Sequence, residues 1–437
     1  MFKFLQYPFL LTCTIGSSVM QVISDKISNF FINGKEALMI LCVLGYSQIT
    51  VPIINFIKGE DLNMFSFTED IINYICYISL FHYLQALLYH FIPCKKVYGT
   101  VTPGGNIPTY NDNGFQAWFL TGLLEVVFLS FYNIDERRLL FESLGDFQQA
   151  LNYYGILTAF YFYFMAIASD KKDLNEPEFS NNPIVDFYKG VELHSQNRHG
   201  DSKMIINSRV GMMLWGVINI LAMMASDAPN VKVSSILQLI YITKFFIWES
   251  GYAKTSDITL DRCGYYLFWG CICYVPCIYT SPTVYHYYYP NDNYSLLTVL
   301  SYMYGIYFTY TNWIIDCERT SLREMREKLS PDLYNPGFIK ATYTTSDGKT
   351  NTTYLVARGW MRIASNINYF YEISTSLIWT LGGTIPLNIF CYTYVIYLTV
   401  LLVHRTYRLE TKCKKKYGKA WEDYRKLVPY KIIPGWF

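Results

Sequence analysis

Charged residues are scarce in this chain of 437 residues. Asp, Glu, Lys and Arg make up only 16% of it, whereas soluble domains average about 25%. Hydrophobic residues reach 52% and aromatic residues 18%. A water-soluble fold could not hide so much apolar surface without a very large core. The composition therefore excludes an ordinary soluble domain and indicates a membrane protein.

Several motifs are also missing. No Gly-x-Gly-x-x-Gly turn occurs, which argues against a Rossmann dinucleotide site. Cys271-Ile272-Cys273 has no second ligand pair at zinc spacing, so no metal site is predicted. The cysteines lie mostly in apolar runs, where we expect them to pack as small apolar side chains. The first apolar run lacks a basic start and a cleavage signature, and is expected to be a retained helix.

Long apolar runs take the place of these motifs. A helix needs roughly 20 apolar residues to cross a bilayer, and continuous runs favour helices over the alternating strands of a barrel. The last run contains Gly382-Gly383 and Pro386, so it is expected to be a broken or paired helix. We predict an all-α, polytopic membrane protein of about ten transmembrane helices, without a Rossmann domain. The predicted spans are 8–24, 37–57, 71–92, 115–133, 150–169, 206–226, 234–252, 264–286, 294–315 and 370–403.

Ionisable residues lie in or beside these spans, mostly in the second half of the chain. A charge at bilayer depth is costly unless it is paired or faces a wet cavity. Some of these residues are expected to mark helix ends, but their number predicts an intramembrane cavity in the second half. They are Arg209, Lys244, Glu249, Asp257, Asp261, Asp316, Arg319, Glu372 and His404.

The final segment, 404–437, is basic and aromatic. It holds ten Lys or Arg against three Asp or Glu. A cytosolic juxtamembrane anchor would account for the charge. It would not account for the order of Cys413, Tyr417-Gly418, Trp421 and Tyr424. The segment therefore predicts both a cytosolic C-terminal tail and a site for an anionic ligand.

Motifs along the whole chain resemble the sterol reductase family, which includes the sterol C-14 and C-24 reductases and the lamin B receptor. The Thr-Pro-Gly-Gly stretch at 102–105 and the Tyr-Thr-Thr-Ser-Asp-Gly hairpin at 343–348 favour the 7-dehydrocholesterol branch over the C-14 branch. Other matching positions are Val101, Tyr110, Asn113-Gly114, Gln116-Ala117-Trp118, Asp186-Phe187, Gly190, Glu192-Leu193, Asp201, Lys203, Arg209, Gly211, Trp215, Ile218-Asn219, Trp248-Glu249, Lys254-Thr255, Asp257-Ile258, Asp261, Gly264, Gly270, Pro276 and Tyr279-Thr280.

The resemblance implies a single membrane domain over 1–437. Helices within 1–203 precede helices within 204–403 that line a sterol and cofactor pocket, and the cytosolic tail 404–437 contributes to the cofactor site. It implies NADPH-dependent reduction of the C7–C8 double bond of 7-dehydrocholesterol or a related 5,7-dienic sterol, by proton and then hydride addition, in sterol biosynthesis. The sterol would come from the bilayer, with no nucleic acid partner, and the location would be the endoplasmic reticulum membrane.

The resemblance also implies particular site residues. Tyr279 is the expected proton donor, because a tyrosine is neutral at pH 7 without any pKa shift. Glu192 and Asp257 are secondary candidates, more suited to orienting the reaction. Arg and Lys are expected on the phosphates of NADPH and Tyr near its rings. The expected cofactor residues are Arg319, Val356, Met361, Asn368, Tyr369, Cys413, Lys414, Lys415, Lys416, Tyr417 and Tyr424.

Some positions depart from the family pattern, and most of them exchange a polar residue. One lost charged contact typically costs about 1.5–3 kcal/mol. The sequence therefore leaves alternatives open: a non-catalytic sterol-binding protein of the same fold, a different sterol double-bond reductase, or a membrane methyltransferase of the isoprenylcysteine type. Binding of NADPH or S-adenosylmethionine separates the last of these. The departures are Cys271, Ile315, Met361, Ser365, Asn366, Tyr371, Glu372, Leu409 and the stretch 194–198.

Overall fold

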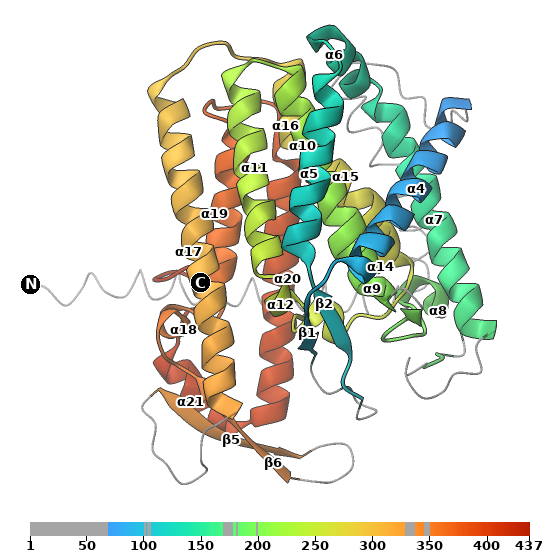
Figure 1. Cartoon of the computed structure of the whole chain (residues 1–437). Coiled ribbons are helices and arrows are strands. Elements are labelled where there is room, and N and C mark those ends of the chain that lie inside the picture. The colour runs from blue at the N-terminus through green and yellow to red at the C-terminus, as the bar shows by residue number, and fades with distance from the viewer. Residues whose placement is uncertain are drawn as a thin grey trace, which may run out of the picture.

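A computed structural model describes residues 69–99, 102, 106–168, 178–180, 182–197, 200–327, 337–344 and 350–437. The predicted spans 8–24 and 37–57 lie outside the described residues. Helices dominate the rest and run roughly parallel to one another (Figure 1). The strands of the described part form three two-stranded antiparallel sheets. The all-α class without a Rossmann sheet is thereby confirmed.

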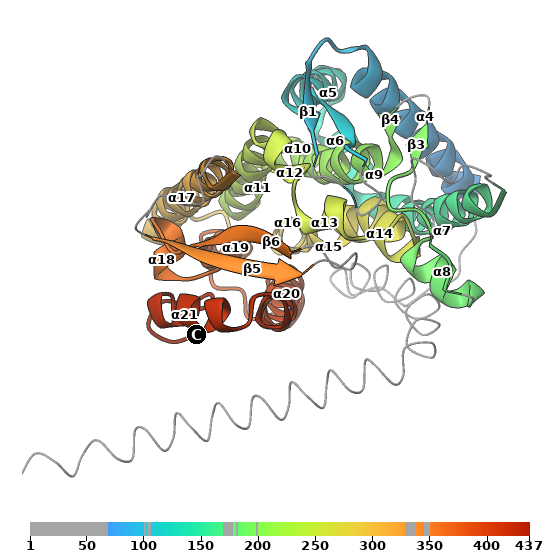
Figure 2. The ribbon, with the colours of Figure 1, turned by 90° about the horizontal axis from the view of Figure 1, so that it is seen from below.

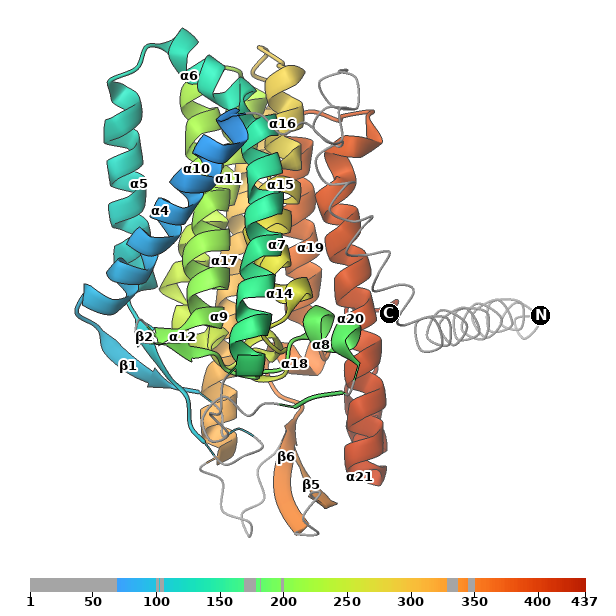
Figure 3. The same cartoon turned by 90° about the vertical axis from the view of Figure 1, so that its right-hand side faces the viewer.

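The first described helices form one side of the bundle. Helix α4 (Glu69–Phe91) leads into the hairpin of β1 (Lys95–Tyr98) and β2 (Thr109–Asp112). Helix α5 (Gly114–Ser130) is followed by α6 (Ile134–Glu142) after a 120° bend. A capping box between Asn133 and Glu136 starts α6 and so fixes this bend. Helix α7 (Leu144–Ala168) then returns alongside α4 (Figure 3).

Two bent spans make the centre of the bundle. After α8 (Pro183–Lys189), β3 (Gln196–Asn197) and β4 (Gly200–Asp201), the first span joins α9 (Ser202–Met204), η2 (Ile205–Met212) and α10 (Met213–Ala225). The second joins α14 (Tyr265–Trp269), η3 (Gly270–Tyr274), α15 (Val275–Ile278) and α16 (Ser281–Tyr288). Between them lie α11 (Pro229–Ile247), α12 (Glu249–Tyr252) and α13 (Ser256–Thr259).

The π-helical segments η2 and η3 of these two spans pack against each other. A Cβ atom at Gly211 would lie 2.4 Å from the backbone oxygen of Cys271, so glycine is needed for this close approach. Cys271 is buried there beside Gly211. Such π-helical turns widen a helix locally and often occur near functional sites.

The remaining elements form the other side. They are α17 (Leu296–Glu327), the hairpin β5 (Phe338–Thr344) and β6 (Thr350–Val356), α18 (Trp360–Ile363), α19 (Ile367–Leu381), η4 (Ile389–Tyr392), α20 (Thr393–Tyr417) and α21 (Lys419–Leu427). The predicted break within 370–403 is confirmed, because α19 ends at Gly382 in the left-handed conformation. The predicted pair of extended pieces around 343–349 is also confirmed, with Thr344 opposite Thr350.

Five helical spans of the described residues are long and apolar enough to cross a membrane, or six if α5 and α6 count as one. The two central spans are largely buried, whereas α4 and α20 leave most of their apolar surface exposed. Such an exposed apolar surface suits lipid rather than water. The chain is therefore an integral, polytopic membrane protein.

Candidate functional site

A buried polar network joins α11, α17 and α19. Lys244 Nζ on α11 donates to Asn312 Oδ1 and to Asp316 Oδ2 on α17, each at 2.5 Å. Asn312 Nδ2 lies 3.4 Å from Glu372 Oε2 on α19. The hydroxyl of Tyr241, also on α11, donates to Glu372 Oε1. The side chains of Lys244 and Asp316 are only 11% and 8% exposed, so these charges are compensated inside the bundle.

An aromatic wall adjoins this network. The ring of Tyr241 packs 5.3 Å from the ring of Trp379 and 5.8 Å from that of Trp215, between centroids. Tyr279, the predicted proton donor, stands edge-on to Trp215 at 5.0 Å and lies 4.3 Å from Tyr394. The structure thus brings Tyr279 to the same aromatic cluster as Tyr241.

Tyr241 was not among the residues predicted from the sequence. The signal was present, because Tyr241 precedes Lys244 by three positions and so shares its face of α11. Its hydroxyl is aligned by the Glu372 carboxylate. Within the described residues the hydroxyl of Tyr279 has no hydrogen-bond partner. The phenol of Tyr241 is therefore fixed in position, with its single proton directed at Glu372.

At the lower end of the bundle, α20, α21 and the hairpin β5–β6 lie together (Figures 1 and 2) and bring some of the predicted cofactor residues into a second cluster, the lower cluster. Tyr424 on α21 is buried and stacks on Trp421 at 4.8 Å, with Cys413 and Tyr417 of α20 packed against this pair. Burial raises the pKa of Tyr424 to about 12, although the positive charges of Arg425 and Arg319 oppose the shift. Arg319 of α17 therefore lies close to Tyr424.

The hairpin β5–β6 extends this cluster. Lys416 Nζ lies 3.8 Å from the centroid of the Tyr343 ring, and Tyr417 meets the same ring edge-on at 5.9 Å. Lys414 and Lys415, the neighbours of Lys416, are exposed. All three lysines are exposed, and Lys416 differs in lying over the Tyr343 ring.

Asn368 and Tyr369 lie in the first turn of α19 and are buried. The backbone oxygen of Asn368 accepts from Asn312 Nδ2 at 3.0 Å, which links this turn to the polar network. Asn368 Oδ1 is buried and has no hydrogen-bond partner among the described residues. Arg405 of α20 interacts with Tyr369 and forms an ion pair of 2.5 Å with Asp257. Asp257 is thus tied to Tyr369 through Arg405.

Two predicted cofactor residues belong to an apolar cluster instead. Met361 is buried with Ile315, and Val356 packs against the same cluster. Ile315, one of the expected departures from the family pattern, is fully buried there. Its surroundings in this cluster are apolar.

Ser365 and Asn366, two of the expected departures from the family pattern, form hydrogen bonds with the C-terminal tail. The amide of Ser365 donates to the oxygen of Tyr430 at 3.0 Å, and that of Asn366 to the oxygen of Lys431 at 2.8 Å. Arg425 Nη2 donates to Ser365 Oγ at 3.3 Å and also pairs with Glu410, which follows Leu409. Leu409 itself is half-buried.

Glu192 lies in the segment after α8. It is buried, and its backbone oxygen accepts from the amide of Cys263 at 2.8 Å. Another buried charge, Arg209, pairs with Glu249 and donates to Asn113 Oδ1 at 3.0 Å. This pair ties η2 to α12 and to the start of α5, as expected for charges at bilayer depth.

The lower cluster suits a dinucleotide phosphate in charge. Arg319 and Lys416 supply cations beside Tyr417 and Tyr424, and the unpartnered Asn368 Oδ1 can accept a hydrogen bond. The elements β5, β6, α20 and α21 lie together on one side of the molecule (Figure 2). The chain can hold such a ligand by side chains alone.

The fold is a polytopic helical membrane bundle. It holds a buried polar network inside the bundle and a basic, aromatic cluster at one end. The model of the ERG4/ERG24 family of ergosterol biosynthesis matches residues 9–437. The chain belongs to this family of sterol reductases.

Individual relatives are similar along most of their length. The 7-dehydrocholesterol reductase of Arabidopsis thaliana is 36% identical over 359 residues, which cover 80% of this chain and 82% of the relative. A probable 7-dehydrocholesterol reductase of Acanthamoeba polyphaga mimivirus is 31% identical over 77% of this chain and 74% of its own. The Delta(14)-sterol reductase of Methylotuvimicrobium alcaliphilum is 27% identical, over 80% of each chain.

Proposed function

We propose that the protein is an NADPH-dependent reductase of the C7–C8 double bond of 7-dehydrocholesterol or a related 5,7-dienic sterol. The similarity to 7-dehydrocholesterol reductases supports the substrate. The observation that carries the proposal is the buried network, in which Tyr241 and Glu372 are linked through Asn312 to Asn368, one of the expected cofactor residues. This network joins a proton donor to the proposed NADPH end.

NADPH would be held at the lower cluster. Arg319 and Lys416 would contact its phosphates, while Tyr417 and Tyr424 would contact its rings. Asn368 and Tyr369 would lie between the cluster and the polar network. When bound, NADPH supplies the hydride. The protein supplies placement and electrostatics.

The chain's own residues must deliver the proton. A diene C=C bond is not polarised toward hydride, so protonation has to develop positive charge on the sterol first. Tyr241 would pass its hydroxyl proton to the sterol and take a proton in return from the protonated carboxyl of Glu372, while Lys244 pairs with Asp316 nearby. Tyr279, which faces the same aromatic wall, is the second candidate. The apolar surroundings keep water from competing for the proton.

The sterol would enter from the bilayer. A groove of about 410 Å³ lies between α11 and α17 and is lined by residues that include Ile240, Thr243, Lys244 and Trp313. It opens beside the polar network, because Lys244 belongs to both. An apolar groove of this size can bind a small lipid.

We further propose that the protein resides in the endoplasmic reticulum membrane with its C-terminal tail in the cytosol. The basic residues that follow α20 support this orientation. A reporter fused after Phe437 should be digested by protease added to intact microsomes. Protection of the reporter would reverse the orientation.

The function can be tested in cells that lack their own reductase, with sterol products identified by mass spectrometry. Wild type should reduce the C7–C8 bond of 7-dehydrocholesterol. Tyr241→Phe should keep sterol and NADPH binding but lose about 10²–10⁴ in rate, as expected for removal of a positioned acid. If Tyr241→Phe is active and Tyr279→Phe is not, the proton comes from Tyr279. Reduction of a Δ14-sterol alone would move the reaction to the C-14 bond.

A second candidate is a non-catalytic sterol-binding protein of the same fold. The complete burial of Ile315 in an apolar cluster favours it, since a polar cofactor contact of the family is absent there. Sterol binding by the purified protein, together with no NADPH binding and no product, would support this reading over the reductase.

A further inference from the structure

A second groove lies on the opposite side of the bundle from the proposed reaction site. It opens between α4 and α7, measures about 410 Å³, and shares no lining residue with the groove between α11 and α17. Ala86, Thr158, Ser202 and Ile205 form its buried floor. Both helices are long and apolar enough to cross a membrane, and they lie side by side in the bundle (Figure 3).

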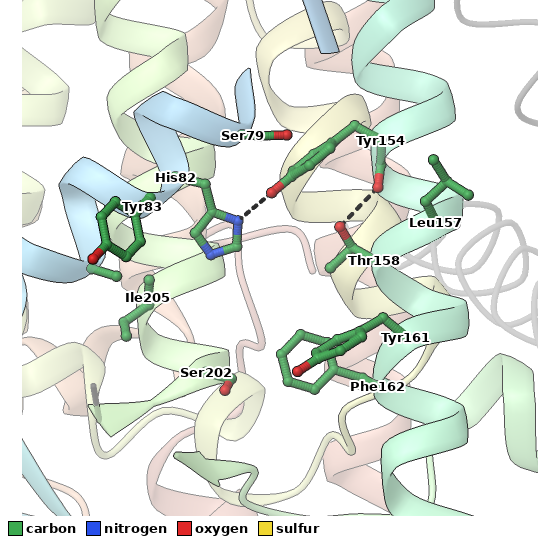
Figure 4. Close-up of a pocket in the computed structure, with 11 residues that line it drawn as sticks. Ser79, His82, Tyr83, Tyr154, Leu157, Thr158, Tyr161, Phe162, Ser202 and Ile205 are labelled. Carbon is green, nitrogen blue, oxygen red and sulfur yellow. Dashed lines mark hydrogen bonds between the residues drawn. The ribbon is translucent and has the colours of Figure 1, made fainter. Parts of the chain in front are cut away.

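The groove contains one prominent polar pair. His82 Nδ1 of α4 lies 2.8 Å from the hydroxyl of Tyr154 on α7. The other ring nitrogen of His82 points away from Tyr154 into the space above Ser202 (Figure 4). The described residues provide no hydrogen-bond partner for it. A half-buried imidazole nitrogen without a partner favours a ligand group at this point.

Two other hydroxyls in the groove already donate to the backbone of their own helices. Ser79 Oγ donates to the backbone oxygen of Ile75 at 2.7 Å, and Thr158 Oγ1 donates to that of Tyr154 at 2.8 Å. The rest of the lining is largely apolar or aromatic, with Leu157 and Tyr161 exposed at the rim. The groove therefore suits a ligand with one small polar group and a large apolar body.

The polar group is best satisfied by a hydroxyl. The free nitrogen of His82 is a donor in one tautomer and an acceptor in the other, and a hydroxyl matches both because it donates and accepts. A carbonyl or ether oxygen matches only one. The volume lies within the range of small-molecule sites, roughly 300–1,000 Å³. Among membrane lipids, a rigid 3-hydroxysterol combines one hydroxyl with an apolar body of this kind.

We propose that the groove between α4 and α7 is a second sterol site, in which His82, oriented by its hydrogen bond to Tyr154, binds the 3-hydroxyl of a sterol taken from the bilayer. The choice of a sterol rests on the proposed function, while the hydroxyl recognition rests on the groove itself. A sterol held there lies outside the polar network of Lys244 and Glu372. The site would therefore hold substrate or product at the membrane without reducing it.

The test is photolabelling of the full-length protein in lipid nanodiscs with a diazirine-bearing 3-hydroxysterol, followed by mass spectrometry of the labelled peptides. Labels are expected on peptides of α4 and α7. Tyr154→Phe and His82→Phe should each weaken labelling there by roughly 3- to 10-fold, as loss of one neutral hydrogen bond does. Tyr77→Phe is the matched control, because Tyr77 lies on α4 but is 63% exposed and does not line the groove.

A 3-deoxy analogue of the same probe keeps the proposal testable even if a variant fails to fold. Wild type should label much less with this analogue. Equal labelling of α4 and α7 by both probes would overturn hydroxyl recognition, and absence of label there would overturn the site. Sterol reduction measured in parallel keeps the two proposals apart. Product formed without label at α4 and α7 refutes only this site, and label there without product refutes only the reductase.

Discussion

Replacing Lys244 by methionine should strongly destabilise the protein. Lys244 donates to Asn312 and Asp316 and lies close to the network of Glu372, in a site that is nearly closed to solvent. Methionine keeps most of the apolar stem but leaves Asp316 buried without its cation. Removing one partner of a buried ion pair typically costs about 3–5 kcal/mol.

A surface pair on the same helix provides the control. Lys232 pairs with Asp227 at 2.8 Å, but these side chains are 32% and 83% exposed. Lys232→Met should therefore cost only about 0–1 kcal/mol. Thermal unfolding of purified protein in one detergent would compare the two variants directly.

A double-mutant cycle separates the charge from the packing. Asp316→Asn removes the carboxylate that Lys244→Met leaves unpaired, so the double variant should be more stable than the sum of the two single effects predicts. Additive losses would contradict the reasoning. So would a Lys244→Met variant that unfolds at the same temperature as Lys232→Met.

Three further changes test other parts of the structure. Arg319→Ala should weaken NADPH binding by about 10-fold or more, measured by titration, since a charge-assisted contact is lost; unchanged affinity in the folded variant would remove Arg319 from the site. Glu410→Gln removes the charge that pairs with Arg425, so limited proteolysis of the tail should become faster, and an unchanged pattern would contradict its docking role. Gly114→Ala would place a Cβ 2.4 Å from Glu249 Oε2; this overpacking should cost at least about 1–3 kcal/mol in thermal unfolding, and wild-type stability would refute the close packing.

The amino-acid sequence determined the class of the fold. Long apolar runs predict helices because each span must satisfy its backbone hydrogen bonds internally in lipid, and the described helices agree with this. Gly382-Gly383 marked the break between α19 and α20, since glycine readily adopts the left-handed conformation that ends a helix. The charge of the tail and the family motifs were likewise readable along the chain.

The sequence was a poorer guide to where helices end and to how neighbouring residues differ. The predicted span 294–315 ends where polar residues begin, but α17 continues to Glu327 because a helix does not need an apolar sequence once it leaves the membrane. The sequence also grouped Lys414, Lys415 and Lys416 together. Only Lys416 lies over the Tyr343 ring, which depends on where the β5–β6 hairpin meets α20.

Only the tertiary structure decided which residues meet. The sequence marked Lys244, Asp316 and Glu372 as costly charges but could not show that Asn312 links them, because these residues come from three different helices. The sequence placed Tyr241 on the same helix face as Lys244, but only the packing of α19 against α11 shows that its hydroxyl donates to Glu372. His82 and Tyr154, 72 positions apart, form one polar pair through the packing of α4 on α7. Helix periodicity fixes the face on which a residue lies, whereas the partner opposite that face depends on how whole helices pack.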